Sequence, residues 1–152
     1  MIDLTTIKLL VYDFDGVMTD NTAFVSENGI EMVRVNRSDG LAVQQLARQG
    51  FKQLILSTEA NPVVTTRAQK LNIDVLQGQD NKKETLIAYC KEHHIELGQV
   101  LYIGNDINDE AVMQIVGMPC CPEDAYPSTK AVATYVIPVK GGQGVIRHLL
   151  EC

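Results

Sequence analysis

The sequence lacks any apolar run close to the roughly 18 residues that a membrane-spanning helix needs. Its opening residues, MIDLTTIK, also lack the long apolar core of a signal peptide. Positive charge is scarce, since 13 lysines and arginines stand against 19 aspartates and glutamates, for a formal net charge of −6. These absences predict a cytoplasmic protein that binds no membrane and no nucleic acid, because a nucleic-acid partner normally requires a basic face.

Cysteine is present in four copies but without the spacing of a metal site or of a disulfide framework. Cys120 and Cys121 are adjacent, while Cys90 and Cys152 stand alone. Without a C-x-x-C pair, we expect free thiols in a reducing compartment. The 152 residues contain no low-complexity segment, and this length suits one domain over residues 1–152.

Apolar strand patterns alternate with helical patterns along the chain. Strands are predicted at 8–14, 51–57, 74–76, 99–103, near Met118 and at 135–139. Helices are predicted from Ser38, as the N-cap, to Gly50, from Pro62 to Leu71, and over 82–94 and 106–116, with a turn at Tyr126–Pro127 and a helical tail after 141–144. The alternation predicts an α/β protein with a three-layer, Rossmann-like parallel sheet and helices on both faces.

One segment departs from this alternation. Asn28–Gly29 is a strong turn signal between two extended patterns and predicts a β-hairpin over about residues 22–36. We expect apolar residues on both faces of this ribbon, Ala23, Val25, Ile30 and Met32 on one and Phe24, Val33 and Val35 on the other. A two-stranded ribbon is marginal alone, so either a second subunit covers it or one face covers its own sheet edge.

Two aspartates, Asp13 and Asp15, directly follow the first predicted strand. Carboxylates this close repel each other, and burial penalises their charged forms. In parallel α/β sheets, ligands bind beyond the carboxyl ends of the strands, which is where this pair lies. A hard cation such as Mg²⁺, held by carboxylates, waters and phosphate oxygens, would offset the repulsion.

The ends of other predicted elements add polar groups to the same rim, namely Ser57, Thr58, Lys82, Asn105, Asp106 and Asp109. Phosphoryl transfer depends on positioning and charge neutralisation, and these groups suit it. One aspartate can attack phosphorus while the other moves a proton, Ser57 can bind phosphoryl oxygens, and Lys82 can offset negative charge. Each signal alone has a plainer explanation as a cap, a turn or a solvated side chain, but their order favours a phosphoryl-transfer site.

These motifs resemble those of the haloacid dehalogenase superfamily of phosphohydrolases. DFDG resembles its first motif, LILS its second, Lys82 its third and GNDIND its fourth. The resemblance implies that Asp13 is the nucleophile, that Asp15 is the general acid and base, and that Mg²⁺ is the cofactor. The implied metal ligands are Asp13, the Asp15 carbonyl, and Asn105 or Asp106, since Asn105 replaces the usual aspartate; Asp109 is expected to orient the site.

DGVMTD, NRSDG and KGGQGVIRHL extend the similarity to small uncapped sugar-acid phosphatases. This group implies a homotetramer formed through the hairpin, and a keto-sugar-acid phosphate as substrate, a nonulosonate 9-phosphate in preference to 3-deoxy-octulosonate 8-phosphate. The expected substrate contacts are Thr58, which replaces a glycine of the pattern, Glu59, Arg67, Lys70 and Arg147. The alternative for the three basic residues is a solvated helix surface.

Two other functions are open to such a chain. The first is a weakly active or inactive oligomerisation domain resembling the C-terminal domain of CMP-sialate synthetases, in which Asn105 marks lost activity. The second is a phospho-acceptor signalling domain, which also combines aspartates, a hydroxyl and a lysine around Mg²⁺. Such a domain carries its acceptor aspartate on the third strand, whereas here Asp13 and Asp15 share the first. The retained Asp13, Asp15, Ser57 and Lys82 favour the enzyme.

Overall fold

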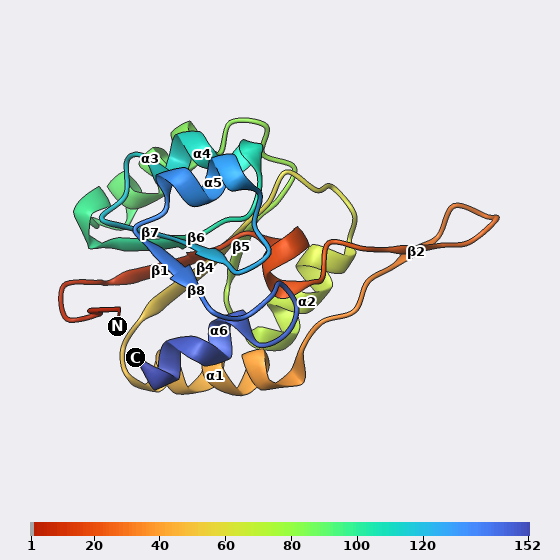
Figure 1. Ribbon diagram of the computed structural model, residues 1–152, viewed down its shortest axis with the longest axis horizontal. Helices are drawn as coiled ribbons and strands as arrows, with labels where there is room; N and C mark the ends of the chain where they lie inside the picture. Colours follow the sequence, from red (N-terminus) through yellow and green to blue (C-terminus); the bar gives the residue numbers. More distant parts are fainter. Residues whose placement is uncertain (1) are drawn as a thin grey trace.

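The centre of the protein is a six-stranded parallel sheet. The computed structural model describes residues 2–152, and Figure 1 shows the sheet between two layers of helices. The strand order is β5-β4-β1-β6-β7-β8. The strands are β1 (Leu9–Tyr12), β4 (Lys52–Leu56), β5 (Asp74–Leu76), β6 (Val100–Ile103), β7 (Met118–Pro122) and β8 (Tyr135–Ile137). Each predicted strand is therefore present, although β1 ends at Tyr12 rather than at residue 14.

Three helices cover each face of the sheet. On one face lie α1 (Arg37–Arg48), α2 (Val63–Leu71) and the short α6 (Val145–His148). On the other lie α3 (Lys82–Glu92), α4 (Ile107–Met113) and α5 (Pro127–Val132). No helix within residues 2–152 combines the length and apolar character needed to cross a membrane.

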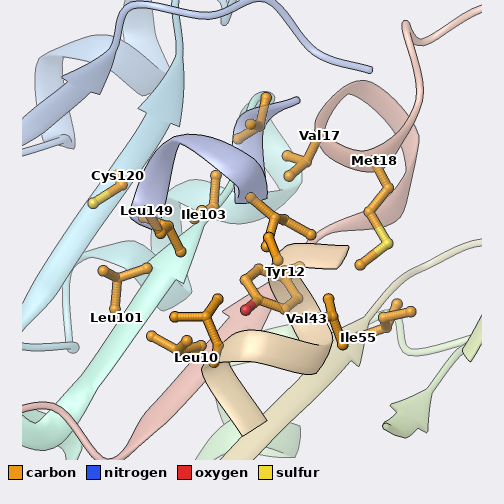
Figure 2. Packing of buried hydrophobic residues seen from close by; sticks show 14 of the residues in the cluster. Leu10, Tyr12, Val17, Met18, Val43, Ile55, Leu101, Ile103, Cys120 and Leu149 are labelled. Atoms are coloured by element: carbon orange, nitrogen blue, oxygen red, sulfur yellow. The ribbon is translucent and has the colours of Figure 1, made fainter. Parts of the chain in front are cut away.

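The central strand β1 is buried on both faces, as expected for a parallel strand between two helical layers. Leu10 and Tyr12 pack with α1, α2 and α6, whereas Leu9 and Val11 pack with α3 and α4. Figure 2 shows Tyr12 among the apolar side chains that lie between the sheet and α1, α2 and α6. Its hydroxyl donates to Gln53 Oε1 at 2.9 Å, which satisfies the polar atom inside the core.

Three local predictions were wrong. The N-cap of α1 is Asn36, whose side chain accepts from the Ser38 amide, so Ser38 lies within the first turn. The helix α2 begins at Val63, with Pro62 just before it. The segment beginning at Pro127 forms the helix α5 instead of a simple turn, since proline at the first helical position favours a helix start.

The hairpin extends away from the rest of the protein in Figure 1. It consists of β2 (Phe24–Val25) and β3 (Glu31–Met32). The register pairs Phe24 with Met32, so these two side chains share a face, contrary to the sequence-based assignment. Phe24 is 72% exposed and Met32 63% exposed, so this part of the hairpin does not cover its own sheet edge.

Candidate active site

The ends of the three central strands bring the predicted polar residues together. Asp13 follows β1, Ser57 follows β4 and Asn105 follows β6. They line a small cavity of about 80 Å³, whose lining residues are Asp13, Asp15, Asn21, Ser57, Thr58, Asn105, Asp106 and Asn108. The cavity is large enough to hold a phosphoryl group but too small for a whole sugar. Asn21 and Asn108 were not predicted, because a single polar residue in a loop gives no pattern.

A tight turn over Phe14–Met18 holds Asp15 beside the cavity. Its Gly16 has φ +86°, and a Cβ there would lie 2.1 Å from Asn105 Nδ2, so only glycine fits. The glycine-rich segment 141–144 supports this turn from the C-terminal part of the chain. Gly142 N donates to the Val17 carbonyl at 3.0 Å, and a Cβ at Gly141 would lie 2.2 Å from the Gly16 oxygen.

Lys82 connects two buried carboxylates beneath the cavity. Its ammonium nitrogen lies 2.9 Å from Asp13 Oδ1 and 2.8 Å from Asp109 Oδ1, and its side chain is 1% exposed. Asp109 is fully buried and fits there because residue 104 is glycine; a Cβ at Gly104 would lie 2.5 Å from the Asp109 carboxyl carbon. The predicted orienting residue thus lies in direct contact with the predicted lysine.

The charges of this cluster do not balance within the protein. Burial raises the pKa of Asp13 to about 8, with a further rise from Asp109 that is opposed by Lys82. Burial works against the Lys82 ammonium, but Asp13 and Asp109 outweigh it and raise the pKa of Lys82. Burial and then Glu59 raise the pKa of Asp15 as well. Asp13 therefore needs another positive charge to be ionised at neutral pH, whereas Asp15 is suited to hold a proton.

Asn105 decides whether a metal ion fits. With its amide nitrogen turned inward, Asn105 donates to the Asp15 carbonyl at 2.8 Å and to Asp13 Oδ2 at 3.2 Å. With its amide oxygen turned inward, three oxygens converge without a proton between them, which is a donor set for a hard cation. Within residues 2–152, no three His, Cys, Asp or Glu side chains form a metal cluster. One carboxylate, one amide and one main-chain carbonyl nevertheless fit Mg²⁺, which keeps several waters.

Asp106 has a different position from Asn105. It lines the cavity, but its Oδ1 accepts from the Ile107 amide at 2.7 Å and so caps α4. Asn105, in contrast, lies against both Asp13 and Asp15. The geometry therefore makes Asn105 the better placed of the two candidate ligands.

A larger cleft continues from the cavity toward the hairpin. It has a volume of about 280 Å³ and shares Asp15 and Asn21 with the cavity. Glu59 and Glu31 also line it, and Asn61 Nδ2 lies 3.4 Å from Glu31 Oε2. The predicted contacts Thr58 and Glu59 are therefore beside Asp15, in acidic surroundings.

The predicted basic contacts lie elsewhere in the protomer. Arg67 and Lys70 line a groove of about 240 Å³ between α1 and α2, and Arg67 Nη2 donates to the Asn36 carbonyl at 3.0 Å. Arg147 pairs with Glu151. None of the three basic side chains lines the cavity or the cleft beside Asp15.

Comparison with known proteins assigns the chain to a family of hydrolases. Residues 42–149 match the haloacid dehalogenase-like hydrolase family. The 3-deoxy-D-manno-octulosonate 8-phosphate phosphatase KdsC of Yersinia pestis is 34% identical over 149 residues, which cover 95% of this chain and 78% of that protein. This chain therefore belongs to the haloacid dehalogenase-like hydrolase family, as its motifs predicted.

Solved structures match nearly the whole chain. A protein from Streptomyces avermitilis assigned as a HAD family hydrolase gives a TM-score of 0.96 at 41% identity, covering 99% of this chain and 87% of that one. The 3-deoxy-D-manno-octulosonate 8-phosphate phosphatase of Moraxella catarrhalis, solved with magnesium, phosphate and KDO, gives 0.93 at 31% identity, covering 97% and 86%. The predicted three-layer α/β fold is confirmed.

Proposed function

We propose that this chain is a Mg²⁺-dependent phosphatase that hydrolyses a keto-sugar-acid phosphate through an aspartyl-phosphate intermediate. The pairing of Asp13 with Lys82 at the bottom of a cavity that Asp15 and Ser57 line carries the proposal. Membership of the family and similarity to the phosphatases named above support it.

In this mechanism the two aspartates of the first motif have different tasks. An Asp13 carboxylate oxygen attacks phosphorus, and the bond between phosphorus and the sugar oxygen breaks. Asp15, whose raised pKa keeps a proton available, gives that proton to the leaving oxygen. Asp15 then takes a proton from a water molecule that attacks phosphorus, and the bond to Asp13 breaks to release inorganic phosphate.

Ser57 and Lys82 would stabilise the transferred group. The Ser57 hydroxyl oxygen accepts from the Glu59 amide at 3.1 Å, so its proton is free for a phosphoryl oxygen. Lys82 offsets negative charge as the new bond forms on Asp13. Asp13, the Asp15 carbonyl and Asn105 would hold Mg²⁺, with Asp106 nearby. The bound ion supplies positive charge that keeps Asp13 ionised and neutralises the phosphoryl oxygens.

The length of the sugar acid is a finer proposal. The Thr58–Glu59, Arg67 and Lys70 pattern favours a nonulosonate 9-phosphate, whereas the Yersinia pestis and Moraxella catarrhalis proteins are octulosonate 8-phosphate phosphatases. In one protomer, only Thr58 and Glu59 of this pattern lie beside Asp15. The preference for nine carbons therefore rests on the sequence pattern.

We also propose that the protein is a homotetramer assembled through the hairpin. The exposed Phe24, Ile30 and Met32 support this, since apolar side chains gathered on a projecting ribbon favour association. A second copy would also cover the cleft that the hairpin borders and limit the entry of water. A weakly active or inactive oligomerisation domain, which is the alternative function, would form the same assembly.

Release of inorganic phosphate from sugar-acid phosphates of eight and nine carbons, with Mg²⁺ and with EDTA, tests these proposals. We expect release that requires Mg²⁺ and is fastest with a nine-carbon substrate. Faster release from the eight-carbon substrate would overturn the nonulosonate preference alone. No release by the natural chain and none by Asn105→Asp would overturn the phosphatase and favour the assembly domain.

A further inference from the structure

Tyr102, on β6, lies beneath the proposed active site without reaching its cavity. The residue is fully buried on the face of the sheet that α3 and α4 cover. Its hydroxyl donates to Asp109 Oδ1 at 2.6 Å, and it is absent from the residues that line the cavity. The hydrogen bond that connects Tyr102 to the site therefore runs through Asp109.

Asp109 is saturated with hydrogen bonds. Its Oδ1 accepts from Lys82 Nζ at 2.8 Å as well as from Tyr102, and its Oδ2 accepts from the amides of Asn105 at 2.9 Å and Asp106 at 3.3 Å. A carboxylate offers about four acceptor sites, so all of them are used. Because the other acceptor sites of Asp109 are occupied, Lys82 gives Asp109 a single hydrogen bond. Its ammonium nitrogen also lies 2.9 Å from Asp13 Oδ1 and can donate a second one there.

We propose that Tyr102 is a positioning residue for phosphoryl transfer, because it fills one acceptor site of Asp109 and so leaves Lys82 shared between Asp109 and Asp13. This inference rests on the proposed function. Without the hydroxyl, Asp109 keeps a buried oxygen with an empty acceptor site, and burial makes such a site unfavourable. Lys82 is the neighbouring donor that can fill it, and by turning toward Asp109 it weakens its contact with Asp13.

The surroundings of Tyr102 keep its hydroxyl a permanent donor. Burial, followed by the nearby Asp109 and Asp13 carboxylates, raises the pKa of Tyr102 well above its ordinary value. The hydroxyl therefore retains its proton at any pH at which the protein works. A phenylalanine would fill nearly the same volume and remove only the donor, which makes the substitution a clean test.

Tyr102→Phe tests the proposal, with Tyr12→Phe as the matched control. Tyr12 is equally buried, lies on the adjacent strand β1 and also makes one hydroxyl bond, to Gln53, but it packs on the opposite face of the sheet from α3, which carries Lys82. We expect Tyr102→Phe to lower kcat by about 10- to 100-fold, the range seen when residues that orient metal ligands are replaced, with KM changed by less than about twofold. Tyr12→Phe should leave both constants close to those of the natural chain.

A second measurement does not depend on turnover. The Lys82 ammonium should give a slowly exchanging signal in ¹H–¹⁵N spectra of the folded protein, identified by its loss in Lys82→Met. We expect this signal to shift or broaden in Tyr102→Phe and to stay unchanged in Tyr12→Phe. An unchanged signal, or a kcat within about twofold of the natural chain, would overturn the positioning role. If the natural chain releases no phosphate, the proposed function fails, and the spectra alone decide whether Tyr102 positions Lys82.

Discussion

The strand-end site and the hairpin depart from the usual distribution of residues in opposite ways. The site buries charged groups, with Lys82 and Asp109 almost inaccessible to solvent, whereas the hairpin exposes Phe24 and Met32. Burying unbalanced charge and exposing clustered apolar surface are both unfavourable for an isolated chain. Each region therefore indicates something that the single chain does not supply, a cation at the site and an apolar surface at the hairpin.

The two regions also differ in how firmly they are held. The site is fixed by hydrogen bonds, and Asp109 alone accepts four of them, from Lys82 on α3, from Tyr102 on β6 and from the Asn105 and Asp106 amides. The hairpin has only two paired positions in its strands and a single bridge, Thr19–Val35, at its base. The comparison teaches that the site residues are held in place within one protomer, whereas the hairpin has few contacts of its own and would gain more in the proposed tetramer.

The largest effect is expected from removing the proposed nucleophile. Asp13→Asn keeps the shape of the side chain but cannot form an aspartyl phosphate, so phosphate release should fall by about 10⁴-fold or more, as when other enzymes lose a nucleophile. Thermal unfolding in EDTA should show a folded protein at least as stable as the natural chain, because the amide is neutral without taking up the proton that the buried Asp13 must bind. Substantial release by this variant would contradict the role of Asp13.

A charge on the hairpin should separate the assembly from the fold. Phe24→Asp places a carboxylate where the proposed interface needs apolar surface, so the tetramer should dissociate to a smaller species while the circular dichroism spectrum is retained. Light scattering after gel filtration gives the mass. Ile87→Asp is the control, because Ile87 is exposed on α3 and away from the hairpin. A tetrameric Phe24→Asp would show that the hairpin does not make the interface.

Asn105→Asp should sharpen the account of the metal site. The added negative charge should tighten Mg²⁺ binding by about tenfold, which corresponds to about 1.4 kcal/mol. Without metal, the variant should unfold at a lower temperature, since the amide donor to Asp13 and the Asp15 carbonyl is lost. Calorimetric titration measures the first effect and thermal unfolding in EDTA the second.

The matched control for this variant is Asn108→Asp. Asn108 lines the same cavity but donates to the Thr58 hydroxyl at 3.3 Å instead of contacting Asp13. Asn108→Asp adds the same formal charge, so an equal gain in Mg²⁺ affinity in both variants would assign the effect to the general electrostatic field in the cavity. Tightening by Asn105→Asp alone would assign it to direct ligation.

The last prediction concerns pH. The folded protein binds a proton at Asp13 more tightly than the unfolded chain, so without metal its stability should fall as pH rises from about 4 to about 8. Burial also raises the pKa of Asp39, to about 6, and the pKa of Asp15, so the difference between the natural chain and Asp13→Asn from pH 6 to 8 gives the Asp13 contribution. That contribution should not exceed about 1.4 kcal/mol per pH unit. Urea unfolding in EDTA measures it, and a slope retained in Asp13→Asn would assign it to another group.

The sequence was sufficient where a pattern and a topological rule acted together. The apolar runs before Asp13, Ser57 and Asn105 predicted strands, and the parallel sheet then placed these residues at one edge. The hairpin was found from Asn28–Gly29, but the face of the ribbon predicted for Phe24 was wrong. Strand register depends on the geometry of the turn and cannot be obtained by counting alternate residues through it.

Other features could not be found from sequence patterns. Tyr102 lies in an apolar run and looks like a core residue, because its hydroxyl partner Asp109 comes from the following helix. Arg67 and Lys70 share a helix face as predicted, but the packing of α2 against α1 sets the groove that they line. Helical periodicity shows which residues share one face of a helix, but it does not show which other element packs against that face.

The contact between segment 141–144 and the turn after β1 has a practical consequence. Gly141 leaves no room for a side chain beside the Gly16 oxygen, so these two loops, distant in the sequence, pack directly against each other. A label, crosslinker or bulky residue introduced at Gly141 would displace Asp15 without touching it. The hairpin turn at Gly29, where an added Cβ would meet no atom within 4 Å, is the safer point of attachment.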